Sequence, residues 1–259
     1  MIQTVYRSSQ TVQKTAHFHD CHQIILVTRG YADFCVNDKK YRACAGDIAL
    51  FSRYEDHSVI GCSDGYERYV LHIDPDVVNR KSPVYSLTTD RPRGFCNVIS
   101  LGESAGQACT IFEQILGEQS ENERLREEMT DLLVKQLLIL AYRCTPFDFE
   151  SGYDSVVIAV KREFENDCKK QYTLDMLARE HNISVSALSH RFHAVTGTSV
   201  MGYLQSCRIA GAKRLLAEGE MPIGEIVERC GFSDCSNFSR TFKALTALTP
   251  TQFRKKYKL

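Results

Sequence analysis

The stretch GFSDCSNFSRTFKALTALTPTQFR, Gly231 to Arg254, decides the fold of the back half of this 259-residue chain. It opens with a glycine and continues with Phe238 and Phe242, whose four-residue spacing is typical of the buried face of a helix. Just upstream, Ile223 and Ile226 have the three-residue spacing of a shorter helix. The stretch therefore predicts a helix, a tight turn and a second helix.

The same pattern occurs a second time, about 50 residues earlier. The segment LDMLAREHNISVSALSHRFHAVTG, Leu174 to Gly197, aligns with Ile223 to Ala247, and it has Asn182 where the later copy has Gly231. Both residue types tolerate a positive φ at a turn. Residues 203–217 between the copies predict a helix that holds the two units at a fixed spacing. A single unit would fit an ordinary helical bundle, whereas two copies in register indicate paired helix-turn-helix units.

These segments resemble the DNA-binding region of the AraC/XylS family of bacterial transcription regulators. The resemblance extends from Val156 to Arg254, and RIAGAKRLLAEGEMPIGEIVERC is similar to the family's linker helix and the entry into its second unit. One departure is Ala247, where the family usually has the glycine that Gly197 provides in the first unit. The resemblance implies promoter DNA and RNA polymerase as partners, and it favours activation over repression.

The charge distribution agrees with a DNA-binding back half. Residues 154–259 contain 16 Lys and Arg against 11 Asp and Glu, and residues 1–153 contain 16 against 21, so that the whole chain has no net charge. An acidic half joined to a basic half indicates two domains with different partners.

The second helix of a helix-turn-helix unit enters the major groove, where its exposed face reads base edges. By resemblance to the family, this face supplies the predicted base contacts Ser186, Ser189, His190, Ser236, Asn237 and Arg240. The Arg240 guanidinium suits guanine, and the Asn237 amide suits adenine. Further side chains are predicted to contact phosphates, which position the protein without reading sequence: Arg191, His193, Lys243 and Arg254.

The first hundred residues predict a β domain. Short runs rich in β-branched and aromatic residues alternate with turn signals such as Gly30 and Asn37-Asp38, as in residues 23–29, 31–36, 47–51 and 66–73. This spacing is typical of a sandwich or small barrel. We expect an α+β protein of two domains, with a β domain at residues 1–102, a helical segment at 103–144, a linker at 145–153 and an all-α DNA-binding domain at 154–259.

Residues 103–117 and 121–143 predict the two helices of that segment. The second helix has an apolar stripe at three- and four-residue steps: Leu125, Met129, Leu132, Leu133, Leu137 and Leu140. The stripe fits packing against the β domain or pairing of two chains, and the two roles are compatible. We expect a homodimer.

The segment HFHDCHQIILVTRG, which starts at His17, resembles the first motif of cupins, H-x-H-x-x-x-E-x(6)-G, with Gln23 in place of the glutamate. Glu55-Asp56-His57 resembles the second cupin motif. Cupin-like barrels bind effectors in many members of the regulator family. The resemblance implies such a barrel, with an effector pocket that includes His17, His19, Gln23 and His57.

Two roles remain open for these histidines. Three imidazoles, from His17, His19 and His57, are enough to bind a divalent zinc, iron or nickel ion, which would make the protein a metal-responsive regulator. Gln23 lacks the negative charge of a glutamate, which favours an organic effector, with sugars as the family precedent and no required cofactor. His22 lies at an odd offset from His19 and is expected to face away from the pocket.

Other classes of protein fit less well. No stretch approaches the ~18 apolar residues of a membrane helix, and the N-terminus lacks a signal sequence, so a cytoplasmic protein is expected. The 11 cysteines form no C-x-x-C pair and are expected to be buried hydrophobes. A cupin enzyme would lack the glutamate and would have no use for a DNA-binding half, so no catalysis is expected. The front domain disfavours a monomeric regulator without an effector.

Overall fold

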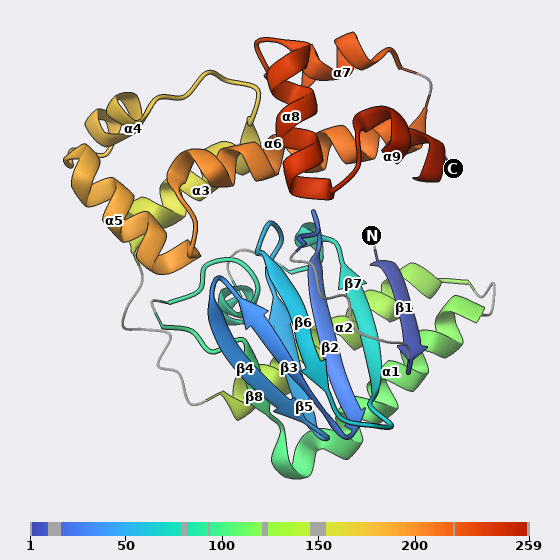
Figure 1. Cartoon of the computed structure of the whole chain (residues 1–259). Helices are drawn as coiled ribbons and strands as arrows, with labels where there is room; N and C mark the ends of the chain where they lie inside the picture. Colours follow the sequence, from blue (N-terminus) through green and yellow to red (C-terminus); the bar gives the residue numbers. More distant parts are fainter. Residues whose placement is uncertain are drawn as a thin grey trace. The chain divides into compact units, whose positions relative to one another are not determined.

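Two antiparallel β-sheets form the framework of the first of two units, Met1–Tyr153 and Asp154–Leu259 (Figure 1). The computed structural model describes residues 2–9, 17–78, 82–92, 94–120, 124–145, 154–219 and 221–257. Most of the predicted linker, residues 146–153, lies outside the described residues. Each unit is described by itself below.

The larger sheet has the strand order β1-β7-β2-β5-β8, and the smaller sheet has the order β4-β3-β6. The strands of the larger sheet are β1 (Ile2–Ser8), β2 (His22–Arg29), β5 (Asp47–Phe51), β7 (Glu67–Ile73) and β8 (Val98–Ser100). Those of the smaller sheet are β3 (Tyr31–Val36), β4 (Lys39–Cys44) and β6 (His57–Cys62). Asn37 and Asp38 both adopt a positive φ and join β3 to β4, which confirms the predicted turn.

Alternation along the strands creates two cores, one on each face of the larger sheet. On β2, Ile25 and Val27 pack with Phe34 and Phe51 between the two sheets. The intervening residues, such as Ile24, pack toward the helices on the opposite face. A side chain's position in the strand therefore decides whether it points between the sheets.

Helices α1 (Ala105–Ser120) and α2 (Arg126–Cys144) cover that opposite face, together with the short 3-10 segments η1 (Pro75–Val77) and η2 (Pro83–Leu87) (Figure 1). A third short 3-10 segment, η3 (Gly102–Ser104), leads into α1 and buries none of its residues. The predicted stripe on α2 is divided between two surfaces. Leu133, Leu137 and Leu140 are buried against the sheet. Leu125, Met129 and Leu132 are exposed, so only part of the stripe packs against the β domain.

Strands β1, β4, β6 and β8 were not predicted. All four lie at sheet edges, where one side of the backbone has no neighbour in the sheet and the sequence needs less apolar alternation. In β4, for example, Lys39, Lys40 and Arg42 are exposed. Both predicted helices of this unit were placed close to their observed positions, and the residues 103–104 belong to η3 instead of α1.

In residues 154–219 and 221–257, the described part of the second unit, every regular element is a helix. Its helices are α3 (Ser155–Asn166), α4 (Leu174–Glu180), α5 (Val185–Thr196), α6 (Val200–Glu218), α7 (Ile223–Arg229), α8 (Cys235–Thr246) and α9 (Pro250–Tyr257). Helix α6 includes the helix predicted at residues 203–217, and it buries Leu204, Ile209, Ala212 and Leu216. The pairs α4-α5 and α7-α8 form the two helix-turn-helix units, and Leu188, Phe192, Phe238 and Phe242 are fully buried in them. None of the helices in the described ranges is both long and apolar enough to span a bilayer.

The two turns have the same backbone pattern and differ in length. Asn182 and Gly231 both have a positive φ, of 54° and 77°. The next amide closes each turn, from Ile183 to the Ala178 carbonyl and from Phe232 to the Val227 carbonyl. The N-cap of the following helix then comes two residues after Asn182 and three residues after Gly231, so the second turn has one extra residue.

Candidate functional site

Helices α5 and α8 begin and end in equivalent ways. The Ser184 side chain accepts a hydrogen bond from the Ala187 amide at 3.1 Å, and the Asp234 carboxylate accepts one from the Asn237 amide at 2.7 Å. These N-caps satisfy amides that the first turn of a helix leaves unpaired. Both helices end at a residue in the left-handed conformation, Gly197 and Ala247.

The predicted base contacts lie on the solvent side of these helices. Ser186, His190, Ser236 and Arg240 are exposed, whereas Ser189 and Asn237 are half-buried. His190 and Arg240 occupy equivalent positions, because each comes two residues before the second buried residue of its helix, Phe192 in α5 and Phe242 in α8. Equivalent exposed positions on the two helices therefore carry different side chains, an imidazole on α5 and a guanidinium on α8.

The four predicted phosphate contacts divide into two groups. His193 and Lys243 are exposed, each one residue after a buried phenylalanine. Arg191 is half-buried and donates two hydrogen bonds to the Asp154 carboxylate, both of 2.6 Å. Arg254 donates to the Met221 carbonyl at 2.5 Å. Both arginines therefore hold the unit together, a role that the sequence did not indicate.

Two further side chains fix the spacing of the units. Arg208, on the long helix α6, is buried and donates to the carbonyls of Cys168 and Lys170 at 2.8 and 2.9 Å. Gln171 in the same loop donates to the Gly231 carbonyl at 3.0 Å. The loop after α3 is thus tied both to α6 and to the turn of the second unit, so the two recognition helices do not depend on α6 alone for their separation.

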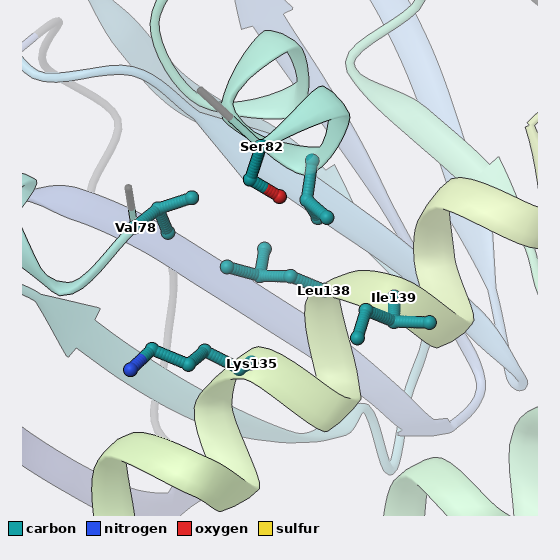
Figure 2. A pocket seen from close by; sticks show the side chains of 6 residues that line it. Val78, Ser82, Lys135, Leu138 and Ile139 are labelled. Carbon is teal, nitrogen blue, oxygen red and sulfur yellow. The ribbon is translucent and has the colours of Figure 1, made fainter. Parts of the chain in front are cut away.

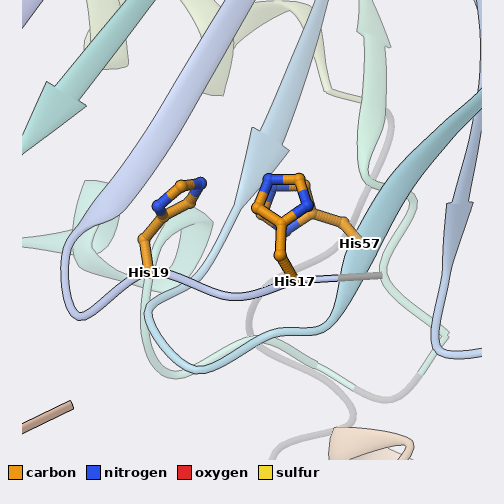
Figure 3. A group of neighbouring side chains, drawn as sticks. All are labelled: His17, His19 and His57. Atoms are coloured by element: carbon orange, nitrogen blue, oxygen red, sulfur yellow. The ribbon is translucent and has the colours of Figure 1, made fainter. Parts of the chain in front are cut away.

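In the first unit, the structure brings His17, His19 and His57 together (Figure 3). The backbones of His17 and His57 exchange two hydrogen bonds of 3.0 Å, which sets the two residues side by side. The ring centroids are 4.5 Å apart for His17 and His57, 5.0 Å for His17 and His19, and 5.3 Å for His19 and His57. One nitrogen from each ring lies within 4.8 Å of the others.

His57 is the most constrained member of this histidine cluster. Its Nδ1 lies 2.9 Å from the Glu55 carbonyl oxygen, and its ring stacks on Phe51 at a centroid distance of 4.2 Å. A carbonyl can only accept, so Nδ1 carries the proton. The buried Nε2 has no hydrogen-bond partner among the described residues. Burial, with the nearby His17, lowers the pKa of His57 to about 3, so the ring is neutral at pH 7.

A buried ion pair supports the loop that carries His57. Arg91 donates to Glu55 at 2.7 Å and also to the Leu87 and Leu50 carbonyls. The same Glu55 oxygen, Oε2, accepts a hydrogen bond from the Asn97 amide group at 3.0 Å. These bonds fix the residues just before the start of β6. The sequence pointed to Glu55 only as part of a motif and did not identify Arg91 or Asn97.

Gln23 and His72 complete the polar surroundings of the cluster. Gln23 Nε2 lies 2.8 Å from His72 Nε2 and 3.5 Å from His19 Nε2. Burial, with the nearby His17, lowers the pKa of His72 to about 4. His72 was missed because its motif position is not distinctive, although β7 pairs it directly with Gln23. His22 points away, with its Nδ1 accepting from the Arg53 amide at 3.1 Å, as predicted.

Comparison with known families accounts for both units. A family model described as an AraC-like ligand binding domain matches residues 3–138, and a helix-turn-helix domain model matches residues 177–256. The chain belongs to the AraC family. This AraC-family protein is a transcription regulator with an N-terminal ligand-binding domain and a C-terminal DNA-binding domain.

Curated relatives of this AraC-family chain are similar over most of their length. The HTH-type transcriptional activator RhaR of Escherichia coli O139:H28 (strain E24377A / ETEC) is 26% identical over 253 residues, which cover 92% of this chain and 86% of RhaR. The RhaR of Shigella dysenteriae serotype 1 (strain Sd197) is 28% identical with the same coverage.

Solved structures show the same fold. ToxT from Vibrio cholerae O395, bound to (E)-4-(8-methylnaphthalen-1-yl)but-3-enoic acid, matches with a TM-score of 0.63 and 15% identity, over 99% of each chain. ToxT from strain SCE256, bound to an unsaturated fatty acid, matches with a TM-score of 0.57 and 17% identity, over 96% of this chain and 93% of ToxT. At this identity the match establishes the architecture of the AraC-family chain.

The ligand-binding unit of this AraC-family protein also contains a cavity away from the histidines. It has a volume of about 200 Å³ and lies between α2 and the segment of η1 and η2 (Figure 2). Its lining is mostly apolar and includes one cation: Val78, Ser82, Val84, Lys135, Leu138 and Ile139. It shares no residue with the predicted effector pocket.

Proposed function

We propose that this AraC-family protein is a cytoplasmic transcriptional activator that reads promoter DNA with α5 and α8 and responds to a small effector held between its sheets. The observation that carries the proposal is the equivalent construction of α5 and α8. Each has a side-chain N-cap, a buried apolar face and an exposed polar face. Relatives that are named transcriptional activators support activation, with RNA polymerase as the partner. A regulator of this kind does not need to catalyse a reaction.

The chemistry of the exposed faces assigns different tasks to the two helices. Arg240 on α8 can donate two hydrogen bonds to a guanine, which is the commonest specific contact in the major groove. His190, at the equivalent position of α5, has a shorter side chain than Arg240 and discriminates less between bases. His193 and Lys243, at the next exposed positions, meet the phosphates on either side. In this arrangement α8 contributes more to sequence preference than α5.

The effector pocket lies where His17, His19, Gln23 and His57 converge. Imidazole and amide groups can donate or accept hydrogen bonds, and aromatic neighbours such as Phe51 supply apolar contact. A small polar organic molecule, with a sugar as one example, fits these groups. Effector binding changes promoter occupancy only to the extent that the effector has a higher affinity for one arrangement of the DNA-binding units than for another.

A second copy of the chain is the expected partner of α2. Leu125, Met129, Leu132 and Ile139 are 64, 47, 61 and 42% exposed, and they recur at four-, three- and seven-residue steps along one side of the helix. A row of large apolar side chains on a surface is typical of a protein interface. Pairing of two α2 helices would place two DNA-binding units on one promoter.

The DNA-reading assignment is tested by selecting binding sites from random duplex DNA and then measuring affinity and footprint. We expect Arg240→Ala to weaken cognate binding by ~1–3 kcal/mol and to relax preference at one base pair. Lys39→Ala, which removes an exposed cation from β4, is the matched control and should leave both unchanged. Unchanged affinity and sequence preference in Arg240→Ala would remove Arg240 from the interface.

A further inference from the structure

The histidine cluster has the construction of a metal site. We propose that His17, His19 and His57 bind one divalent transition-metal ion of the zinc, cobalt or nickel type, and that the ion's remaining coordination position receives an oxygen atom of the effector. The ion site stands on its own geometry. The role of the open position deepens the effector pocket proposed above and rests on it.

The first argument is distance. One nitrogen from each of the three rings lies within 4.8 Å of the others. Nitrogens bound to one tetrahedral zinc ion, at about 2.0–2.1 Å from the metal, are about 3.3 Å apart. Side-chain rotations that move each ring by about an ångström would close the site, without any change in the backbone that holds His17 against His57.

The second argument is the state of His57. Its Nδ1–H donates to the Glu55 carbonyl, which leaves the lone pair of Nε2 free to bind. That Nε2 is buried and has no hydrogen-bond partner among the described residues, a situation that normally destabilises a fold. Metal-binding histidines usually have this arrangement, in which the second ring nitrogen donates to a carbonyl or a carboxylate. A metal ion at Nε2 would satisfy this buried nitrogen.

The third argument is rigidity. The two-way backbone bridge fixes His17 to His57, and the Arg91–Glu55–Asn97 network fixes the loop that leads to His57. The Tyr54 amide donates to the His19 carbonyl at 2.8 Å, which anchors the third ligand to the same loop. Ligands held in this way lose little conformational freedom on binding an ion.

The ligand chemistry selects the class of metal and of effector. Imidazole ligands suit zinc, nickel, cobalt and iron, whereas magnesium and calcium require mainly oxygen ligands. The three imidazoles bring no negative charge, so a bound ion keeps its full charge. Gln23, adjacent to His19 and His72, provides an amide where a carboxylate would have neutralised part of it. The open position therefore favours an anionic oxygen, such as the carboxylate of a small organic acid.

The ion is tested first, with the metal alone. The full-length chain is stripped with a chelator and titrated with Zn²⁺, Co²⁺ and Ni²⁺ by calorimetry, with elemental analysis of the metal retained after desalting. We expect one ion per chain, and a Co²⁺ visible spectrum that shows nitrogen coordination. His17→Ala and His19→Ala should each weaken binding at least about tenfold, the scale on which even outer-shell changes act. Both residues are only half-buried, so these variants should fold.

Two matched variants sharpen the result. His190→Ala removes an exposed histidine of α5 and should bind the metal like the parent chain. Gln23→Glu adds a carboxylate beside the cluster and should strengthen binding about tenfold, because the charge of the ion is then partly neutralised. Absence of stoichiometric metal, or undiminished binding in the His17→Ala/His19→Ala double variant, would overturn the proposal.

The effector side is tested separately, by adding simple carboxylic acids to the Co²⁺-loaded and metal-free chains. A change in the Co²⁺ spectrum, absent in the His17→Ala/His19→Ala variant, supports an open position that accepts an anionic oxygen. An unchanged spectrum with every acid overturns that part of the proposal. Selection of DNA sites by the metal-free chain is measured in parallel. This result tests the DNA-reading function alone and does not depend on whether the histidine cluster binds an ion.

Discussion

The Arg191 guanidinium holds the Asp154 carboxylate through two hydrogen bonds of 2.6 Å, and that carboxylate also accepts from the Val157 amide at 3.1 Å as the N-cap of α3. Partial burial of Asp154 opposes its ionisation, but the bonds from Arg191 and the Val157 amide hold its pKa below the usual value. One arginine of the recognition helix α5 thereby fixes that helix to the start of α3.

Removal of this contact should reduce stability more than DNA binding. We expect Arg191→Ala to lower the free energy of unfolding by about 1–2 kcal/mol, a value discounted for the partial exposure of the pair. Urea unfolding followed by circular dichroism measures the loss, and Lys243→Ala, at an exposed position of α8, is the control. If stability were unchanged and the salt dependence of DNA binding became weaker, Arg191 would be a phosphate contact instead.

The end of α8 is strained and can be improved. Ala247 adopts φ 59°, a left-handed conformation that costs a residue with a Cβ roughly 1 kcal/mol and that glycine adopts freely. Ala247→Gly should therefore stabilise the chain by up to about 1 kcal/mol in urea unfolding. Gly197→Ala, the reverse change at the equivalent residue of α5, should destabilise it by a similar amount. A loss of stability in Ala247→Gly would contradict this account.

In the second helix-turn-helix unit, the turn at Gly231 requires glycine both for its positive φ and for a close backbone contact. A Cβ on Gly231 would lie 2.7 Å from the Cα and carbonyl oxygen of Lys169, in addition to the positive φ. We expect Gly231→Ala to cost about 2–5 kcal/mol, since backbone strain and overpacking act together. The equivalent Asn182→Ala tests the φ effect alone and should cost about 1 kcal/mol. Equal losses for the two variants, measured by thermal and urea unfolding, would show that the close approach to Lys169 is relieved at little cost.

The Arg91–Glu55 ion pair should contribute far more to stability than the exposed Arg42–Asp33 pair. Arg91→Met removes the cation beside the largely buried Glu55 carboxylate, which keeps only hydrogen bonds from Asn97 and the Ser52 amide, and we expect a loss of about 3–5 kcal/mol. Arg42→Met breaks the exposed pair with Asp33 and should cost less than about 1 kcal/mol. The double variant Arg91→Met/Glu55→Gln should recover part of the loss, because no buried charge remains without a partner. Similar small losses in both single variants would mean that water reaches Glu55.

The exposed side of α2 should set the oligomeric state. Leu132→Glu places a charge in the apolar row and should convert a dimer to a monomer in light scattering. Glu127→Lys changes an exposed charge of the same helix five residues from Leu132, on another side of the helix, and should leave the dimer intact. A parent chain that is monomeric at all concentrations would rule out pairing through α2.

Local patterns in the sequence were enough to predict the two helix-turn-helix units of residues 154–259. A helix buries residues at three- and four-residue steps, so the spacing of Leu188 with Phe192 and of Phe238 with Phe242 identifies their fully buried faces. The helices between and around them follow from the same rule. The clamp made by Arg208 was not predictable, because its acceptors lie on a loop 38 and 40 residues away.

The histidine cluster was only partly predictable for a similar reason. The cupin-like motifs indicated His17, His19 and His57, and the structure places them together. His72 belongs with them because β2 and β7 pair in a register that sets it opposite Gln23. Strand register depends on contacts between distant segments, and no pattern within β7 itself distinguishes His72 from a surface histidine.

The extra residue in the second turn, together with the different side chains on α5 and α8, makes the two helix-turn-helix units unequal. Two identical readers would bind a pair of half-sites equally well in either order. Unequal readers bind one order better than the other, so the order of the half-sites fixes which way the bound chain points relative to the gene. The DNA site then encodes a direction as well as a location, and one copy of the chain is enough to distinguish upstream from downstream.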